Sequence, residues 1–224
     1  MEHLTSAKIL FENRRDAGDK LAAELGQFAN NSVVLAIPNG GVPIGVSVAD
    51  HLNAELEVIV SRKIPMPLSP EGGLGAITDD GTIILNKEIV KRDKITPEQI
   101  EYEANKVRNN IKQRSLKYKG NRLLVSVTGK TVILVDDGLA SGITMMAAMA
   151  SVRHRRPKAV VVAVPVASEW AAEKVAGAAD KLIMCAIASV KKFYVADYYR
   201  NWRDLKDEEV IRSLEQWRLR RMYE

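Results

Sequence analysis

Two adjacent acids, Asp136 and Asp137, follow an apolar run in the middle of the chain and precede a loop of small residues. The run 132–135 has no polar side chain, which is typical of a strand buried on both faces of a parallel sheet. Ligands bind at the carboxyl ends of such strands, where loop N–H groups and the hydroxyls of Ser141 and Thr144 can converge on an anion at a helix N-terminus. Carboxylates repel phosphate, so this pair makes sense only if the ligand also carries hydroxyl groups or a metal ion.

A sugar phosphate meets both conditions. The run from Val132 to Thr144 resembles the phosphoribosyl pyrophosphate (PRPP) signature of type I phosphoribosyltransferases: an apolar strand, two acids and a short loop ending in Gly-x-Thr. The resemblance implies that Asp136 and Asp137 hold the ribose hydroxyls and Mg²⁺, directly or through water. It also implies that the 5′-phosphate is bound by the loop of Ala140, Ser141, Gly142, Ile143 and Thr144. Gly138 departs from the family pattern, which usually has an aliphatic residue there, and a plain acidic turn is the alternative interpretation.

A second candidate loop, Asn39-Gly40-Gly41, follows a predicted strand over 33–37. It is not a dinucleotide fingerprint, because that motif needs glycine where the chain has Val42, and no Walker Gly-Lys-Ser/Thr ending occurs anywhere. The loop resembles the pyrophosphate-binding loop of the phosphoribosyltransferases. The resemblance implies that Asn39, Gly40 and Gly41 bind pyrophosphate and that the Asn39–Gly40 peptide bond is cis. A simple glycine turn into a helix is the alternative.

Two cations, Arg62 and Lys63, follow the next predicted strand, 56–60. In the family a basic residue at this place touches the PRPP phosphates, so the resemblance assigns Arg62 and Lys63 a part in catalysis; solvated surface charges are the alternative. Residues 64–74 contain three prolines and no periodic pattern. This composition predicts a flexible loop that closes over the substrate and excludes water.

The stretch from Phe193 to Trp202 is rich in aromatic residues in a chain with only 5% of them. It is similar to the C-terminal segment of purine-salvage phosphoribosyltransferases, in which an aromatic ring stacks on the base and a later acid contacts it. The resemblance implies that Phe193, Tyr194 and Asp197 contact the acceptor. Packing in an aromatic core, or a dimer contact, is the alternative.

The remaining pattern predicts the elements that position these loops. We expect an amphipathic helix over 6–29 capped by Ser6, a hairpin over 74–85, a helix from Thr96 to about Leu116 and a C-terminal helix over 207–221. The alternation of strands and helices from residue 132 onward predicts right-handed crossovers and a parallel sheet. The expected fold class is therefore α/β: a central, mainly parallel sheet flanked by helices, with a small hood or hairpin and a C-terminal helix. We expect one domain over 1–224, with the hood and last helix over 189–224.

Composition sets outer limits on the function. The formal charge of +5 and the pI of about 9.2 favour anionic ligands, but no basic motif interleaved with aromatic residues points to nucleic acid. Cys185 is the only cysteine, so neither an intramolecular disulfide nor a cysteine zinc cluster is expected. The apolar runs are too short to span a bilayer and the N-terminus lacks the apolar region of a signal peptide, so we expect a cytoplasmic protein. A homodimer is implied by the family resemblance only.

These observations predict Mg²⁺-dependent transfer of a phosphoribosyl group from PRPP to a nitrogenous acceptor, with a nucleobase among the candidates, and release of pyrophosphate. Ala140 argues against ordinary purine salvage. Hypoxanthine-type enzymes have an aspartate as the third residue after the acidic pair, where it accepts a proton from the purine, and alanine transfers no proton. The rival prediction is a PRPP-binding regulator that keeps the fold without turnover.

Overall fold

The computed structural model describes residues 1–67, 69–120 and 125–223, and at 69–72 the backbone alone. Its elements are, in chain order, β1 Glu2–Leu4, α1 Arg14–Ala23, η1 Gly26–Phe28, β2 Ser32–Ala36, α2 Gly41–Leu52, β3 Glu55–Val58, β4 Ser61–Met66, β5 Ser69–Thr78, β6 Ile83–Leu85, α3 Lys87–Arg92, α4 Pro97–Lys119, β7 Thr131–Val135, α5 Ile143–His154, β8 Ala159–Ser168, α6 Glu169–Ala176, β9 Lys181–Ala188, η2 Val195–Tyr198 and α7 Asp207–Tyr223.

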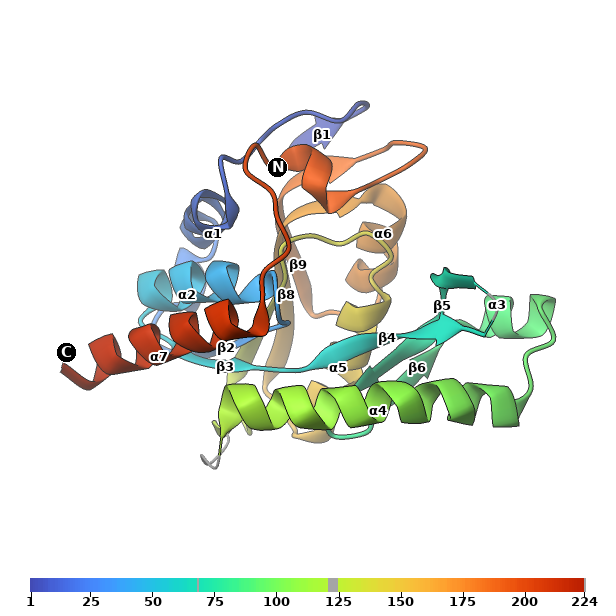
Figure 1. Ribbon diagram of the computed structural model, residues 1–224. Helices are drawn as coiled ribbons and strands as arrows, with labels where there is room; N and C mark the ends of the chain where they lie inside the picture. Colours follow the sequence, from blue (N-terminus) through green and yellow to red (C-terminus); the bar gives the residue numbers. More distant parts are fainter. Residues whose placement is uncertain (68, 121–124, 224) are drawn as a thin grey trace.

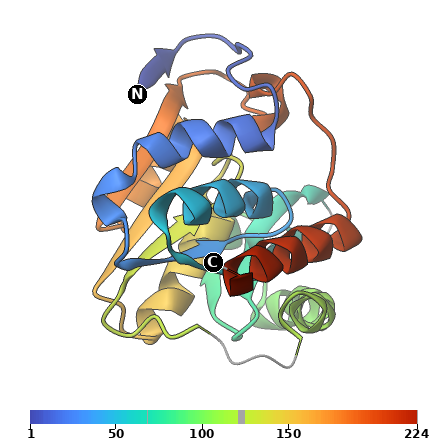
Figure 2. The same ribbon diagram turned by 90° about the vertical axis from the view of Figure 1, so that its left-hand side faces the viewer.

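A parallel six-stranded sheet forms the centre, with the strand order β1-β9-β8-β7-β2-β3. Successive residues of a strand point to opposite faces, so Val34 belongs to the core under α1, α2 and α7, whereas Val33 and Leu35 belong to the core under α5 and α6. Figure 2 shows α1, α2 and α7 together in front of the sheet. The predicted α/β class, with a parallel sheet buried on both faces, is confirmed.

The strand order reverses direction between β2 and β7. From β2 the chain passes through α2 to β3 on one side, and from β7 it passes through α5 to β8 and then β9 on the other. The two helices consequently leave on opposite faces of the sheet, and the loops after β2 and β7 separate at this point. In open α/β sheets such a reversal creates the crevice where ligands bind, outside the carboxyl ends of the strands.

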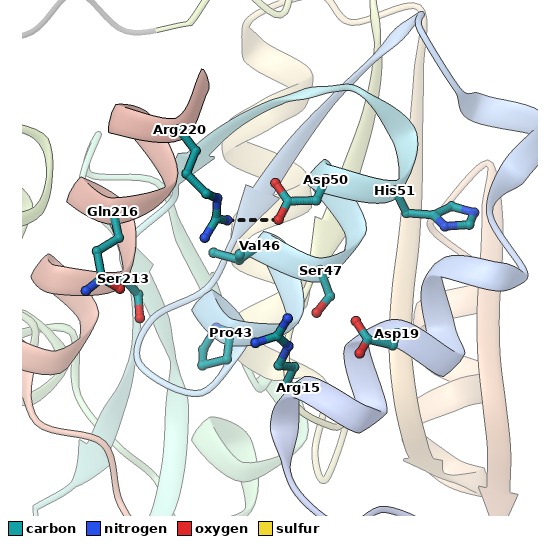
Figure 3. A pocket seen from close by; sticks show the side chains of 10 residues that line it. All are labelled: Arg15, Asp19, Pro43, Val46, Ser47, Asp50, His51, Ser213, Gln216 and Arg220. Atoms are coloured by element: carbon teal, nitrogen blue, oxygen red, sulfur yellow. Dashed lines mark hydrogen bonds and ion pairs between the residues drawn. The ribbon is translucent and has the colours of Figure 1, made fainter. Parts of the chain in front are cut away.

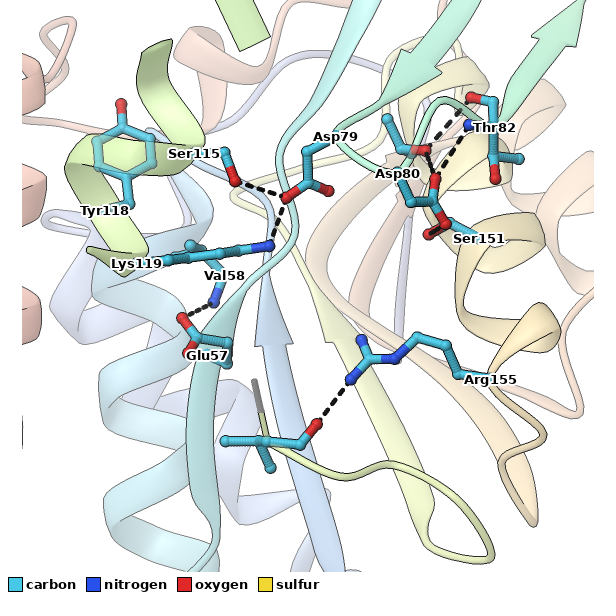
Figure 4. Close-up of polar contacts among 12 residues, drawn as sticks. Glu57, Val58, Asp79, Asp80, Thr82, Ser115, Tyr118, Lys119, Ser151 and Arg155 are labelled. Carbon is cyan, nitrogen blue, oxygen red and sulfur yellow. Dashed lines mark hydrogen bonds and ion pairs between the residues drawn. The ribbon is translucent and has the colours of Figure 1, made fainter. Parts of the chain in front are cut away.

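A smaller antiparallel sheet, β4-β5-β6, lies beside α4 (Figure 1). The predicted hairpin is confirmed: β5 pairs with β6, and Ile77 lies opposite Ile83. Both acids of its turn are anchored (Figure 4). Asp79 accepts hydrogen bonds from Ser115 and Lys119 of α4, whereas Asp80 accepts from Ser151 of α5 at 2.7 Å.

Residues 64–74 differ from the predicted loop. The described part of this stretch continues β4 and begins β5, while residue 68 lies outside the described residues. The pairing is irregular, with register shifts on both sides of Pro65, whose partner is Gly73. Proline and glycine mark bulges in strands as well as loops, so the composition did not reveal these strands. Closure of the segment over a substrate stays a prediction.

The N-terminal helix is shorter than predicted. It begins at Arg14, because the side chain of Asn13, not Ser6, accepts hydrogen bonds from the N–H groups of Arg15 and Asp16 at 2.9 and 3.1 Å. The predicted start of α4 is correct, with a complete capping box between Thr96 and Gln99. None of the helices in the described ranges is long and apolar enough to cross a membrane.

Candidate active site

The two candidate loops meet at the carboxyl ends of β2 and β7. These strands are neighbours in register, with Ala36 opposite Val135. The contact is so close that a Cβ on Gly40 would lie 1.8 Å from Oδ2 of Asp137, and one on Gly41 would lie 2.8 Å from the carbonyl oxygen of Val135. Glycine is therefore required at position 40 because the loop passes directly over a carboxyl group of the acid pair.

The cis peptide bond lies one residue earlier than predicted, between Pro38 and Asn39, so the prediction for Asn39–Gly40 is wrong. The bond falls inside a turn that begins as soon as β2 ends. The N–H of Gly41 donates to the carbonyl oxygen of Ile37 at 3.0 Å and closes this turn. The chain thus reverses between residues 38 and 40, and Asn39-Gly40-Gly41 faces the acid pair.

The acids themselves form a tight pair. The backbone N–H of Asp137 donates to Oδ1 of Asp136 at 2.8 Å. Burial and the neighbouring charge of Asp137 raise the pKa of Asp136 well above its usual range. Burial also raises the pKa of Asp137, and the positive charge of Arg14 offsets part of this increase. The site therefore favours a ligand or cation that stabilises the ionised carboxylates.

Arg14 is a site residue that the sequence did not reveal. Its Nε lies 2.8 Å from Oδ2 of Asp137, and its Nη1 donates to the carbonyl oxygen of Arg203 at 2.8 Å. The guanidinium carbon stands 3.8 Å from the ring centroid of Trp202, a cation–π contact. Arg14 lies inside the stretch that the pattern predicts as an amphipathic surface helix, where a buried cation leaves no periodic signal.

The predicted 5′-phosphate loop, residues 140–144, leads into α5. Gly142 has φ +67°, a left-handed conformation that favours glycine, and directly precedes the first helical residue, Ile143. The first N–H groups of a helix have no partner within it, so the start of α5 offers donors to an anion. Ser168 anchors the loop by donating its hydroxyl to the carbonyl oxygen of Ala140 at 2.8 Å, and Ser61 donates to that of Thr144 at 2.9 Å.

The structure accounts for the unusual Gly138. A Cβ at this position would lie 2.8 Å from Cγ1 and 2.9 Å from Cγ2 of Val195, and 3.2 Å from the carbonyl oxygen of Val166. The aromatic segment thus packs directly on the acid-pair loop. Tyr199 reinforces this contact, because its hydroxyl donates to the carbonyl oxygen of Asp137 at 2.7 Å.

The side chain of Asn39 points to a polar cluster between α4 and the chain before α7. Its Nδ2 donates to the carbonyl oxygen of Leu205 at 2.6 Å and to Oδ1 of Asp207 at 3.3 Å. Its Oδ1 accepts from Arg114 at 3.1 Å. The hydroxyl of Tyr118 lies at the same distance and shares its one proton with Oδ1 of Asp207, which is 2.7 Å away. Burial and the hydrogen bond with Asp207 raise the pKa of Tyr118 to about 12. Both N–H groups of the amide are thus used, and its oxygen accepts from Arg114.

Arg62 and Lys63 line a pocket of about 460 Å³ between β4 and α4, together with Lys106, Asn110 and Arg114. Arg114 connects this basic pocket to the pyrophosphate loop through its hydrogen bond to Asn39. The two predicted cations are thus next to a residue that contacts the loop, although they make no recorded contact with the acid pair among the described residues.

The predicted acceptor residues lie on the surface of the hood. The ring of Phe193 stacks on Tyr198, with centroids 5.1 Å apart, while Tyr194 is 59% exposed and Asp197 is exposed. Tyr198 and Tyr199 are buried, so part of the aromatic segment packs in the core as the alternative interpretation held. An acceptor role for Phe193, Tyr194 and Asp197 stays a prediction.

A second cavity, of about 650 Å³, lies away from the acid pair. Side chains of α1, α2 and α7 line it (Figure 3), and Arg220 and Asp50 form an ion pair across it at 2.9 Å. It has two further charged residues from α1, Arg15 and Asp19, and no residue of either candidate loop. This cavity is therefore not the candidate active site, despite its volume.

Other missed residues had a detectable signal. Arg114 and Tyr118 continue the four-and-three spacing of Ile100, Ala104, Val107 and Ile111 along α4, so the inward face of this helix extends to the pyrophosphate loop. Trp202 and Tyr199 belong to the aromatic stretch already noted. Asp207 gave no such signal, since an acid in the first turn of a helix is common for reasons of helix polarity.

The fold and the two loops define a class: α/β proteins with two small-residue loops at the carboxyl ends of neighbouring strands, where a parallel sheet reverses its strand order. The model of the phosphoribosyl transferase domain matches residues 6–196, and the chain belongs to this family. The protein named "Putative phosphoribosyl transferase Rv0571c" from Mycobacterium tuberculosis is 35% identical over 207 residues, which are 92% of this chain and 46% of that protein. The chain thus spans about half the length of the curated relatives it matches.

Two solved structures are similar to the chain. The crystal structure of TT1426 from Thermus thermophilus has a TM-score of 0.78 and 34% identity, and the alignment covers 93% of this chain and 99% of that one. The AQ2163 protein from Aquifex aeolicus has a TM-score of 0.50 and 11% identity, with 78% of this chain and 74% of that chain covered. At that identity the second likeness shows the fold alone.

Proposed function

We propose that the chain transfers the phosphoribosyl group of PRPP to a nitrogen atom of an acceptor and releases pyrophosphate. One observation carries the proposal: the acid pair and the Asn39-Gly40-Gly41 loop touch at the point where the strand order reverses. A ligand with ribose hydroxyls and a diphosphate at adjacent carbons fits this juxtaposition, because each half of the site suits one of its groups.

In the reaction, the bond between C1 of the ribose and the pyrophosphate oxygen breaks, and its electron pair leaves with pyrophosphate. A bond from C1 to the acceptor nitrogen forms, and the acceptor loses a proton if that nitrogen carried one. Positive charge develops on the ribose ring, and the carboxylates of Asp136 and Asp137 hold the ring hydroxyls and stabilise this charge. Catalysis by such a site is mostly positioning and electrostatics.

The start of α5 and residues 140–144 seat the 5′-phosphate in this proposal, and the N–H groups of the loop 39–41 receive pyrophosphate. Arg62 and Lys63 supply positive charge from the basic pocket that Arg114 connects to this loop. Removing water from these contacts strengthens them, because the effective dielectric constant falls.

Magnesium fits the acid pair. Two partly buried carboxyls with raised pKa values favour a cation beside them, and Mg²⁺ is usually bound by one or two carboxylates together with substrate phosphates. The described residues contain no group of three or more His, Cys, Asp or Glu side chains that could hold a metal ion without such a substrate. When bound, Mg²⁺ neutralises charge on the leaving pyrophosphate.

Because residue 140 is alanine, the site lacks at this position the general base that would accept a proton from the acceptor. Its carbonyl oxygen is occupied by Ser168, and its methyl side chain transfers no proton. We therefore propose an acceptor whose nitrogen is already deprotonated or neutral, or whose proton passes to solvent. This separates the proposed reaction from ordinary purine salvage.

The test is pyrophosphate release from PRPP and Mg²⁺ with a panel of nucleobases and other nitrogenous acceptors. We expect turnover with at least one acceptor, and its loss in Asp137→Asn. Tight binding of PRPP without turnover across the panel would contradict an enzyme and support the rival, a PRPP-binding regulator. Retention of nucleic acid that weakens steeply with salt would strengthen that rival.

A further inference from the structure

One segment of the chain, residues 202–207, reaches both halves of the candidate site. At its beginning, Trp202 lies under the guanidinium of Arg14, and the carbonyl oxygen of Arg203 accepts from the same group. At its end, the carbonyl oxygen of Leu205 and the carboxyl group of Asp207 accept from Asn39. In Figure 1 this segment descends from the hood to the start of α7.

Arg14 joins the segment to the acid-pair loop. It is 9% exposed, and its recorded partners belong to the two sides: Asp137 on one, Trp202 and Arg203 on the other. Moving either side away would leave a buried guanidinium partly unpaired, which is costly. The loop and the segment are thus fixed relative to each other.

Asn39 joins the other end of the segment to the pyrophosphate loop. Both amide N–H groups of Asn39 are occupied by Leu205 and Asp207, and its oxygen faces Arg114 and Tyr118, so the side chain has no donor left for an anion. In the part of the chain that the structure describes, no partner is recorded for the backbone N–H of Asn39 or Gly40, whereas that of Gly41 donates to Ile37. The backbone N–H groups of the loop can therefore bind an anion, while the side chain of Asn39 is fixed by its contacts on the opposite side.

We propose that residues 202–207 form a clamp, with Arg14 and Asn39 as positioning residues, that holds the acid-pair loop and the pyrophosphate loop at a fixed spacing before the ligand binds. The match to the phosphoribosyl transferase domain ends at residue 196, so the clamp lies beyond the matched residues. Fixing the two loops in advance lowers the ordering cost of binding. That the ligand is PRPP rests on the proposed function; the mechanical coupling of the loops does not.

The test is a double-mutant cycle that releases each end of the clamp separately. Trp202→Leu removes the ring that stacks on Arg14, and Asp207→Ala removes a hydrogen-bond partner of Asn39. Each substitution thus changes one end of the clamp. Affinity for PRPP with Mg²⁺ is measured by calorimetry. We expect each variant to bind about tenfold more weakly and the double variant to be little weaker than either, because release of one end already frees the segment.

Two matched controls accompany the cycle. Trp170→Leu removes an exposed tryptophan that stacks on Lys174 in a similar way, and Glu208→Ala removes the next acid in the first turn of α7. Both should leave affinity unchanged. If the double variant instead binds PRPP about a hundredfold more weakly than the wild type, the effects of the two changes are independent. That result would overturn the proposal.

Hydrogen–deuterium exchange supplies a readout that needs no ligand. With a clamp, Trp202→Leu accelerates exchange in the distant loop 37–41, and Asp207→Ala accelerates it in 136–142. Changes confined to the mutated end would overturn the proposal. If Trp202→Leu does not fold, Arg14→Lys replaces it, since lysine keeps a charge at Asp137 without the planar stacking on Trp202. Absence of PRPP binding by the wild type, together with coupled exchange, would reject the proposed function and leave the clamp.

Discussion

At the scale of single residues, the chemistry of the site follows from how closely backbone and carboxyl groups approach. Gly40 passes over Asp137, Gly138 lies against Val195, and Gly142 takes a left-handed conformation before α5. A side chain at position 40 would displace the carboxyl group of Asp137, and one at position 138 would displace Val195. Close contacts thus explain why positions 40 and 138 are glycine, whereas backbone conformation explains Gly142.

Gly138→Ala tests this role of close contact in the acid-pair loop. The added methyl group overlaps both methyl groups of Val195, so we expect the free energy of unfolding to fall by about 1–3 kcal/mol, the usual cost of overpacking. Combining it with Val195→Ala should restore much of the loss, and denaturant unfolding measures all three variants. A double variant as unstable as the sum of the two single changes would show that Val195 is not the reason for glycine here.

Site residues could be predicted from the sequence where their types and positions are typical of a ligand-binding loop. Residues that belong to the site only through contacts with distant parts of the chain could not. Asp136, Asp137 and the two loops were predicted because acids and small residues directly after a buried strand are typical of a ligand-binding edge. Arg14 and Asp207 were not, because a cation or an acid at the start of a helix is ordinary until the fold brings it to a distant loop. The cis bond was predicted one residue late because it was placed by resemblance to the family loop and not by a pattern in these residues.

At the scale of elements, the hairpin β5–β6 is held between α4 and α5 by the acids of its turn (Figure 4). It carries β4, and hence Arg62 and Lys63, through the antiparallel pairing of β4 with β5. Burial alone would raise the pKa of Asp80, but hydrogen bonds from Thr78, Ser151 and Thr82 outweigh it and lower the pKa to about 2. The ionised form of Asp80 therefore stabilises the folded chain.

Asp80→Asn tests this anchor. The folded pKa lies below the unfolded value near 3.8, so the stabilisation is present above that pH and is lost as the pH falls through about 2. We expect a loss of about 1 kcal/mol at pH 7, since solvent screening weakens an exposed group, and the difference from wild type should shrink as the pH falls through about 2. Urea unfolding across this range measures it, with Asp19→Asn on α1 as the control. A difference independent of pH would contradict the role of the charge.

At the scale of the whole molecule, the parallel sheet brings the ends of β2 and β7 together, and the C-terminal segment covers both loops that follow them. Strand patterning predicted this sheet because buried parallel strands are uniformly apolar. The irregular pairing of β4 with β5 and the contacts of the last helix could not be predicted, since both depend on contacts that the local sequence pattern does not encode. The site is consequently assembled from parts of the chain that are far apart in sequence.

The most direct test of the account is calorimetric titration of PRPP with Mg²⁺ into the wild type and into Asp136→Asn/Asp137→Asn. We predict that the wild type binds and that the double variant binds at least about a hundredfold more weakly, because two charge-assisted contacts to the ribose are lost. Circular dichroism should show the variant folded, since burial already disfavours both charges. Equal affinity in the two proteins, or no binding by the wild type, would contradict the central claim.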